Sequence, residues 1–155
     1  MKIINAGVTA PKGFKCAGLR AGVKSGKTNK DMAMIVSEVP AKIAGTFTKN
    51  IVKAAPVLWG KKIVEEQEVV INTGIANACT GAQGYENVVT EAKEVAKLLD
   101  IKPEEVVVGS TGVIGQQLPM DVIKEGIKKL VPELKADRQS EEDASWAILT
   151  TDTKP

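Results

Sequence analysis

The side chains best suited to chemistry in this sequence lie between Val106 and Pro119. Three β-branched residues lead into Gly109-Ser110-Thr111-Gly112, and an amphipathic segment follows Pro119, so this run predicts a buried strand, a small-residue turn and a helix. Such a turn leaves backbone N–H groups open to a ligand. Gly112 can offer its N–H to a developing oxyanion, and Thr111 can add a hydroxyl. The alternative is an ordinary turn, where Ser, Thr and Gly are favoured for conformation alone.

A second candidate is the stretch from Asn72 to Gly81, which follows a short apolar run and is rich in small polar residues. It is longer than a simple connection of about two to six residues. Two interpretations stay open. The loop lines a substrate pocket, or its Asn and Thr side chains bond to the loop's own backbone.

A third candidate is Thr150-Thr151-Asp152-Thr153, which follows the apolar residues 147–149. Four consecutive small polar residues are poor material for continuing a helix. They either turn the chain or line a pocket. The sequence reaches Pro155 with no helix stop signal, which favours an interrupted chain over a natural terminus.

The missing residue types restrict the chemistry. The chain has no histidine, so Ser-His-Asp and Cys-His catalysis within it are excluded. The cysteines Cys16 and Cys79 form no metal-ligand cluster and are predicted to be free thiols. Nothing nearby in sequence would activate Cys79 as a nucleophile. We therefore predict neither a metal nor a cofactor.

Composition narrows the class of protein. The 155 residues are enough for one domain with a real core. Aromatic residues make up 3% of the chain and the net charge is +2, so a base-stacking, basic nucleic-acid surface is not expected. No stretch has the length of a membrane span or a secretory signal. These features predict a soluble, cytoplasmic protein.

The elements that must position the candidate residues follow from periodicity. Strands are predicted over 14–23, 32–39, 44–49, 68–72 and 106–108, and helices over 55–66, 82–100, 119–130 and 141–149, the last one capped by Ser140. In the helix over 82–100, charged residues including Glu91 are assigned to the outer face. Strands come first and strand–loop–helix units follow, which predicts a mixed α/β layered domain.

Side by side, these segments resemble the N-terminal (α) part of the ornithine acetyltransferase family, also called bifunctional glutamate N-acetyltransferase, of arginine biosynthesis. The resemblance rests on five motifs in the family's order: 7–14, 53–56, 72–81, 110–120 and 150–153. It implies a layered αββα sandwich of the ornithine acetyltransferase and self-processing aminopeptidase type. Residues 1–155 would be a single domain of a precursor that cleaves itself, and the β chain would complete the sandwich.

The resemblance also implies a mechanism. The precursor is cleaved at an Ala-Thr bond, and the freed threonine of the β chain takes acetyl from N-acetylornithine and passes it to glutamate; some members also accept acetyl-CoA. An N-terminal threonine can use its own amine as the base, which suits a chain without histidine. By this likeness Thr111 and Gly112 form the oxyanion hole and Thr150 contacts substrate. Two α and two β chains are expected to assemble.

The sequence departs from the family pattern in two places. The family loop usually reads Asn-Ser-Gly-Asn-Ala-Asn; Thr73 keeps the hydroxyl, whereas Ile75 removes an amide. The Gly-Lys-rich segment and the Ala-Thr cleavage site that should follow Pro155 are absent from the sequence, so the chain is not expected to be active alone. The alternatives are a self-processing aminopeptidase with an N-terminal nucleophile and a non-enzymatic domain that binds a small metabolite.

Overall fold

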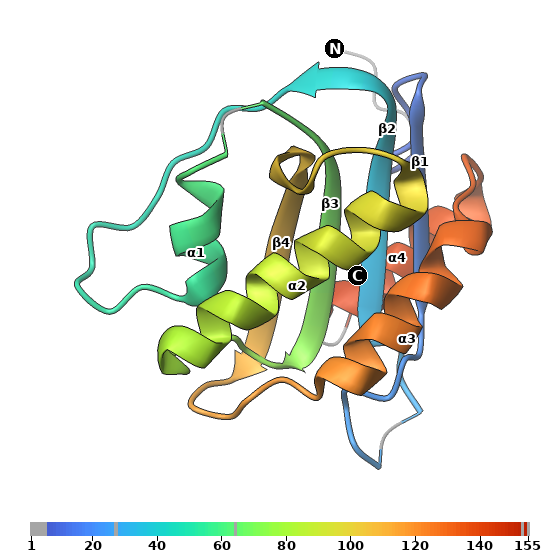
Figure 1. The fold of residues 1–155 in the computed structure, drawn as a ribbon. Helices are drawn as coiled ribbons and strands as arrows, with labels where there is room; N and C mark the ends of the chain where they lie inside the picture. The colour runs from blue at the N-terminus through green and yellow to red at the C-terminus, as the bar shows by residue number, and fades with distance from the viewer. Residues whose placement is uncertain (1–5, 27, 64, 153, 155) are drawn as a thin grey trace.

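A four-stranded sheet forms the centre of the fold (Figure 1), in a computed structural model that describes residues 6–26, 28–63, 65–152 and 154. The strands lie side by side in chain order: β1 (Phe14–Leu19), β2 (Met32–Lys42), β3 (Glu65–Ile75) and β4 (Val106–Val113). The first two pairings are antiparallel, and β3 pairs with β4 in parallel. A parallel pair requires a long crossover, and a helix supplies it here.

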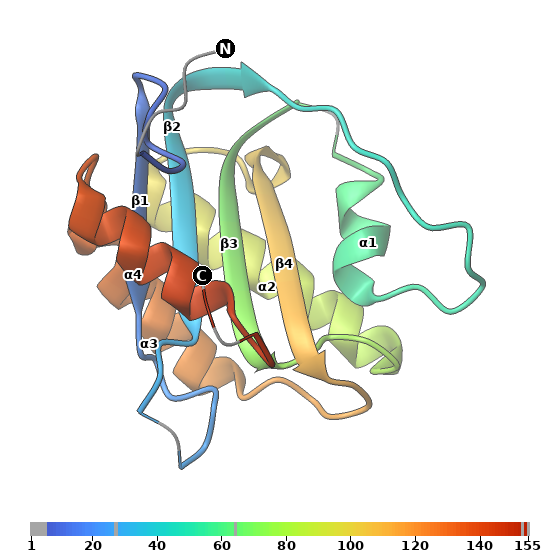
Figure 2. The ribbon, with the colours of Figure 1, turned by 180° about the vertical axis from the view of Figure 1, so that it is seen from behind.

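Helices lie on both faces of this sheet, so the predicted mixed α/β class is confirmed. The crossover helix α2 (Gly81–Leu99) and α3 (Met120–Leu130) cover one face, and α4 (Arg138–Ile148) crosses β1 and β2 on the other (Figure 2). The short helix α1 (Ala55–Gly60) stands beside β4 at the sheet edge (Figure 1). No helix in the described part of the chain is long and apolar enough to cross a membrane.

The core between the sheet and its helices is aliphatic, as a chain poor in aromatic residues requires. Each such side chain contributes roughly 1.5 to 3 kcal/mol by leaving water. The largest fully buried apolar side chains come from the strands and from α2 and α3: Met32, Met34, Val70, Val88, Val95, Val106, Ile123, Ile127 and Leu130. Their spacing in α2 and α3 is the 3.6-residue period that predicted these helices.

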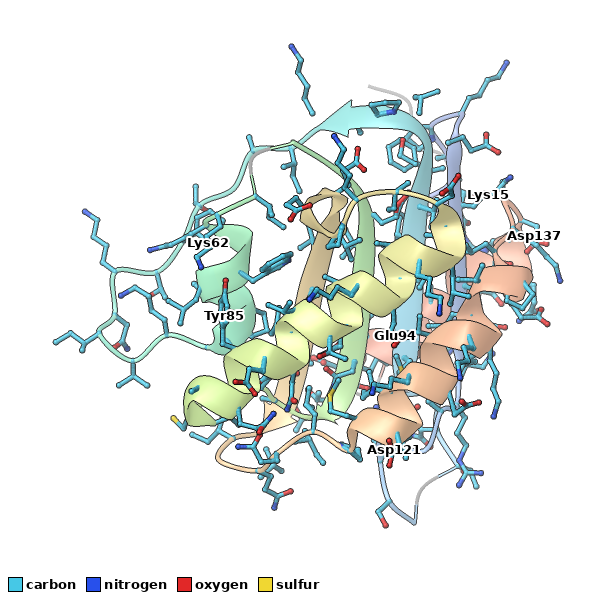
Figure 3. All side chains as sticks on the ribbon, viewed as in Figure 1. Lys15, Lys62, Tyr85, Glu94, Asp121 and Asp137 are labelled. Atoms are coloured by element: carbon cyan, nitrogen blue, oxygen red, sulfur yellow. The ribbon has the colours of Figure 1, made fainter. Side chains whose placement is uncertain are left out.

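The two aromatic residues of α1 and α2 attach the short helix to the rest of the fold. The indole of Trp59 donates a 2.8 Å hydrogen bond to the carbonyl of Val106, at the start of β4. Its ring meets that of Tyr85 edge-on, with centroids 6.4 Å apart. The ammonium of Lys62 donates to the Tyr85 hydroxyl at 2.6 Å, and Figure 3 shows this pair beside α1 and α2.

The predicted turn at 109–112 is wrong, because β4 continues to Val113 and β3 continues to Ile75. The two strands stay in register from the Asn72–Ser110 pair to the Ile75–Val113 pair. Small residues indicate a turn when only local preferences are considered. Here each strand supplies hydrogen-bond partners to the other, so the backbone remains extended beyond the apolar run.

Several other predicted boundaries of helices and strands also differ from those in the structure. Residues 44–49 form no strand, and β1 ends at Leu19. The helix predicted over 55–66 begins at Ala55 as expected but ends at Gly60, and β3 already begins at Glu65; residue 64 lies outside the described residues. The cap of α4 is Asp137, whose carboxylate accepts a 2.8 Å hydrogen bond from the backbone N–H of Ser140. Ser140 is therefore inside the helix, and the assignment of Ser140 as the cap is wrong.

Candidate functional site

A pocket of about 570 Å³ lies at the carboxyl ends of the parallel strands β3 and β4. Thr111 and Gly112 line it from β4, and Thr150 lines it from the segment that follows α4. Figure 2 shows that this segment returns toward the ends of the two strands. Crevices beyond the carboxyl ends of strands are common ligand sites in α/β folds. The fold thus brings together the three residues that the sequence singled out.

Paired glycines keep side chains out of this part of the sheet. Gly74 and Gly112 are register partners, with φ angles of +108° and +133°. A Cβ atom added to Gly112 would lie 2.3 Å from the Gly74 carbonyl oxygen, which is closer than real structures allow. The pocket therefore has bare backbone here, and a ligand can approach it closely.

The donors around this backbone suit a carbonyl or oxyanion oxygen. Thr111, Gly112 and Thr150 are all exposed, so hydroxyl and N–H groups can reach a bound molecule. Among the described residues that line the pocket, Lys24 is the cation, and none is a carboxylate or an imidazole. The pocket can bind and polarise an acyl group, but its described lining supplies no acid–base pair of the usual kind.

Two side chains hold the end of α4 against this site. The Thr73 hydroxyl donates a 2.8 Å hydrogen bond to the carbonyl of Ala147, in the last turn of α4. The ammonium of Lys24 donates to the carbonyl of Leu149 at 2.6 Å. Thr150 follows directly, so its place opposite β4 depends on these contacts. Thr153, the last residue of the third candidate motif, lies outside the described residues.

The polar side chains of the stretch 72–81 mainly form hydrogen bonds within the loop and to the start of α2. This agrees with the interpretation that its Asn and Thr side chains stabilise the loop itself. The Asn72 amide donates to the Ile75 carbonyl at 2.8 Å, and the Asn77 amide donates to the Gly84 carbonyl at 2.8 Å. The Thr80 hydroxyl donates to Asn77 Oδ1 at 2.6 Å. Of this stretch, Gly74 and Ile75 line the pocket, so Ile75 gives this part of the lining an apolar side chain.

Ser110 belongs to the same supporting network. Its hydroxyl accepts a 2.9 Å hydrogen bond from the backbone N–H of Asn77 and donates to the Ile75 carbonyl at 3.2 Å. It connects the end of β4 to the loop after β3, while its neighbour Thr111 lines the pocket.

Both cysteines are free thiols, as predicted. Cys16 is fully buried, and burial together with the charges of Glu141, Asp137 and Asp143 raises the pKa of its thiol to about 11. That thiol stays protonated and unreactive near neutral pH. Cys79, two residues before α2, is exposed with φ +58° and does not line the pocket.

Sequence reasoning missed Val23, Lys24 and Ser25, which also line the pocket. Gly74 and Gln116 line it as well, and both lie within stretches that the sequence singled out, 72–81 and 106–119. Lys24 had no signal in the sequence, since its partner Leu149 is 125 residues away in the chain.

Comparison with known proteins places these features in a family. Residues 15–155 match the model of the ArgJ family. The arginine biosynthesis bifunctional protein ArgJ of Streptococcus mutans is 48% identical over 99% of this chain and 38% of its own length. The chloroplastic ArgJ of Citrullus lanatus is 44% identical over 97% of this chain and 34% of its own length. The chain thus spans somewhat more than a third of these curated relatives.

Two crystal structures share the fold. One is the arginine biosynthesis bifunctional protein ArgJ from Bacillus halodurans, with 41% identity and a TM-score of 0.92 over 99% of this chain and 80% of that one. The other is ornithine acetyltransferase from Mycobacterium tuberculosis in complex with ornithine, with 41% identity and a TM-score of 0.92 over 96% and 81%.

Proposed function

The chain belongs to the ArgJ family, and from that premise we propose that it is the N-terminal part of an acetyltransferase of arginine biosynthesis. The proposed reaction moves acetyl from N-acetylornithine to glutamate and gives ornithine and N-acetylglutamate. One observation carries the proposal: Thr111, Gly112 and Thr150 meet in one pocket that offers donors for an acyl oxygen. The nucleophile comes from a second polypeptide.

In the proposed mechanism, a threonine at the N-terminus of that second chain attacks the acetyl carbonyl, with its own amine as base. The carbonyl oxygen becomes an oxyanion, which Gly112 N–H and the Thr111 hydroxyl stabilise. Collapse breaks the C–N bond, and the ornithine amine leaves with the proton. The amine of glutamate then attacks the acetyl-threonine ester and releases the threonine hydroxyl. Thr150 contacts substrate.

Part of the sheet face that carries α4 is not covered by that helix, which favours a partner chain that packs there. On the face that carries α4, that helix lies mainly over β1 and β2 (Figure 2). A largely apolar hollow of about 690 Å³ lies between β4 and α1, and Phe47 and Ile43 beside it are exposed. Large exposed apolar surfaces mark interaction sites. We infer that the β chain of the same precursor covers this region and completes the αββα sandwich, in a complex of two α and two β chains in the cytoplasm.

The proposal is tested on the protein as its native gene expresses it. Intact mass should reveal this chain together with a second polypeptide that begins with threonine. The purified protein should transfer acetyl from N-acetylornithine to glutamate, and addition of acetyl-CoA tests whether it is a second donor. Peptide hydrolysis without acetyl transfer would instead identify a self-processing aminopeptidase. A single uncleaved chain that binds a metabolite without turnover would leave a binding domain.

Thr111→Ala in that full protein tests the oxyanion assignment. Removing one oxyanion donor costs roughly 2 to 4 kcal/mol of transition-state stabilisation, so kcat should fall about 10²- to 10³-fold. Steady-state kinetics with N-acetylornithine and glutamate measure the change. Thr90→Ala is the matched control, because the Thr90 hydroxyl bonds to the Glu86 carbonyl on α2, away from the pocket. Wild-type kinetics in Thr111→Ala would remove the assignment.

A further inference from the structure

We propose that Lys24 is a positioning residue, which holds the Thr150–Thr151 segment across the pocket from Thr111 and Gly112. The inference rests on the proposed function, because Thr150 matters there as a substrate contact. Lys24 lies in the connection between β1 and β2. Its ammonium donates to the Leu149 carbonyl at 2.6 Å and to the Lys30 carbonyl at 3.3 Å. It thus joins two segments that are distant in sequence.

The backbone of Lys24 is itself fixed by a buried carboxylate. Asp31, the residue before β2, is fully buried. Its carboxylate accepts hydrogen bonds from three backbone N–H groups, those of Ala21 at 2.6 Å, Gly22 at 3.1 Å and Lys24 at 2.9 Å. The backbone of Asp31 is tied to the sheet in turn, since its carbonyl accepts a 2.9 Å hydrogen bond from Thr73 N–H. The backbone that carries the Lys24 side chain is therefore fixed to the sheet through Asp31.

Gly74 makes room for the aliphatic part of Lys24. A Cβ atom at Gly74 would lie 2.7 Å from Lys24 Cγ and 3.5 Å from its Cα. The lysine stem therefore passes directly over β3 at the residue paired with Gly112. Lys24, Gly74, Gly112 and Thr150 all line the same pocket.

The carbonyl that Lys24 binds sets the direction of the next residues. Leu149 is the C-cap of α4 and is extended, with φ −71° and ψ 144°, so the chain leaves the helix there. Its carbonyl belongs to the peptide group shared with Thr150. A hydrogen bond from an ammonium is shorter and stronger than one between neutral groups. Thr73 fixes the last turn of α4, whereas Lys24 fixes the peptide that places Thr150.

The test uses Lys24→Met and Lys24→Arg in the full protein as its gene expresses it. Methionine keeps a stem over Gly74 but removes the donor, whereas arginine keeps donors that can reach the Leu149 carbonyl. Loss of binding energy without loss of chemistry raises KM, so we expect KM for N-acetylornithine to rise about tenfold and kcat to change less than about threefold. In Lys24→Arg, KM for N-acetylornithine should return most of the way to the wild-type value.

Hydrogen exchange of the peptide spanning 147–152 gives a readout that needs no turnover. It should quicken in Lys24→Met, because the segment loses its tether. Lys30→Met is the matched control: it lies in the same connection, and its ammonium pairs with Asp143. If the wild-type protein transfers no acetyl, the proposed function fails while exchange still tests the tether. Unchanged exchange, a loss confined to kcat, no rescue by arginine, or an equal effect of Lys30→Met would overturn the inference.

Discussion

Gly112→Ala is expected to destabilise the fold by roughly 2 to 6 kcal/mol, because overpacking and a strained backbone each cost about 1 to 3 kcal/mol. The backbone at Gly112 has φ +133°, which L side chains rarely adopt. The added methyl group would meet the carbonyl of Gly74 at 2.3 Å, and a paired strand cannot move aside as a flexible side chain can. The pairing of β3 with β4 would loosen at the pocket, and acetyl transfer in the full protein should be lost.

Denaturant unfolding measures the first effect and transfer kinetics the second. Gly13→Ala is the matched control, since Gly13 also has a positive φ, +90°, but nothing lies within 4 Å of an added Cβ atom there. It isolates backbone strain from the clash. If Gly112→Ala destabilises the protein no more than Gly13→Ala does, the close approach of β3 and β4 is not what requires glycine.

Glu91→Gln is expected to stabilise the protein at pH 8, by roughly 3 to 5 kcal/mol at about 1.4 kcal/mol per pKa unit. Glu91 is 1% exposed, and neither carboxylate oxygen has a hydrogen-bond partner among the described residues. Burial raises the pKa of this carboxyl from 4.5 to about 8. The folded state therefore keeps a proton that the unfolded state releases. Glutamine is neutral at every pH and avoids this linkage.

The sign of the pH dependence follows from the raised pKa. The contribution of Glu91 to stability is greatest below pH 4.5, where both states hold its proton, and falls as pH rises toward 8. Above that value the loss is complete. Unfolding free energies measured from pH 5 to pH 8 should fall less steeply in Glu91→Gln than in the wild type. Burial and Glu105 also raise the pKa of Glu68, to about 7, so part of the slope should remain.

Glu86→Gln is the control for Glu91→Gln, because Glu86 is exposed on the same helix. It should leave the slope unchanged. A wild-type slope in Glu91→Gln would show that the buried carboxyl is not the group that titrates.

Glu91 also shows where periodicity fails. Its charge predicts the outer face of the helix, because charged residues normally face water, yet the structure buries it. Asn87, one turn earlier, donates to Gln117 at 3.4 Å, just before α3 begins, and the charge of Glu94, one turn later, acts on Lys128 of α3. Figure 3 shows Glu94 between the two helices. This side of α2 is therefore an interface with α3. No pattern within α2 reports that a second helix packs there.

The sequence by itself determined the helices α2 and α3 and the mixed α/β class, because these depend on neighbours within a few residues. It also indicated Thr111, Gly112 and Thr150 and excluded imidazole chemistry within the chain. Tertiary structure alone decided that 109–112 continues a strand and that Lys24 reaches Leu149. Those features depend on partners far away in the chain, and local conformational preference carries no information about distant partners.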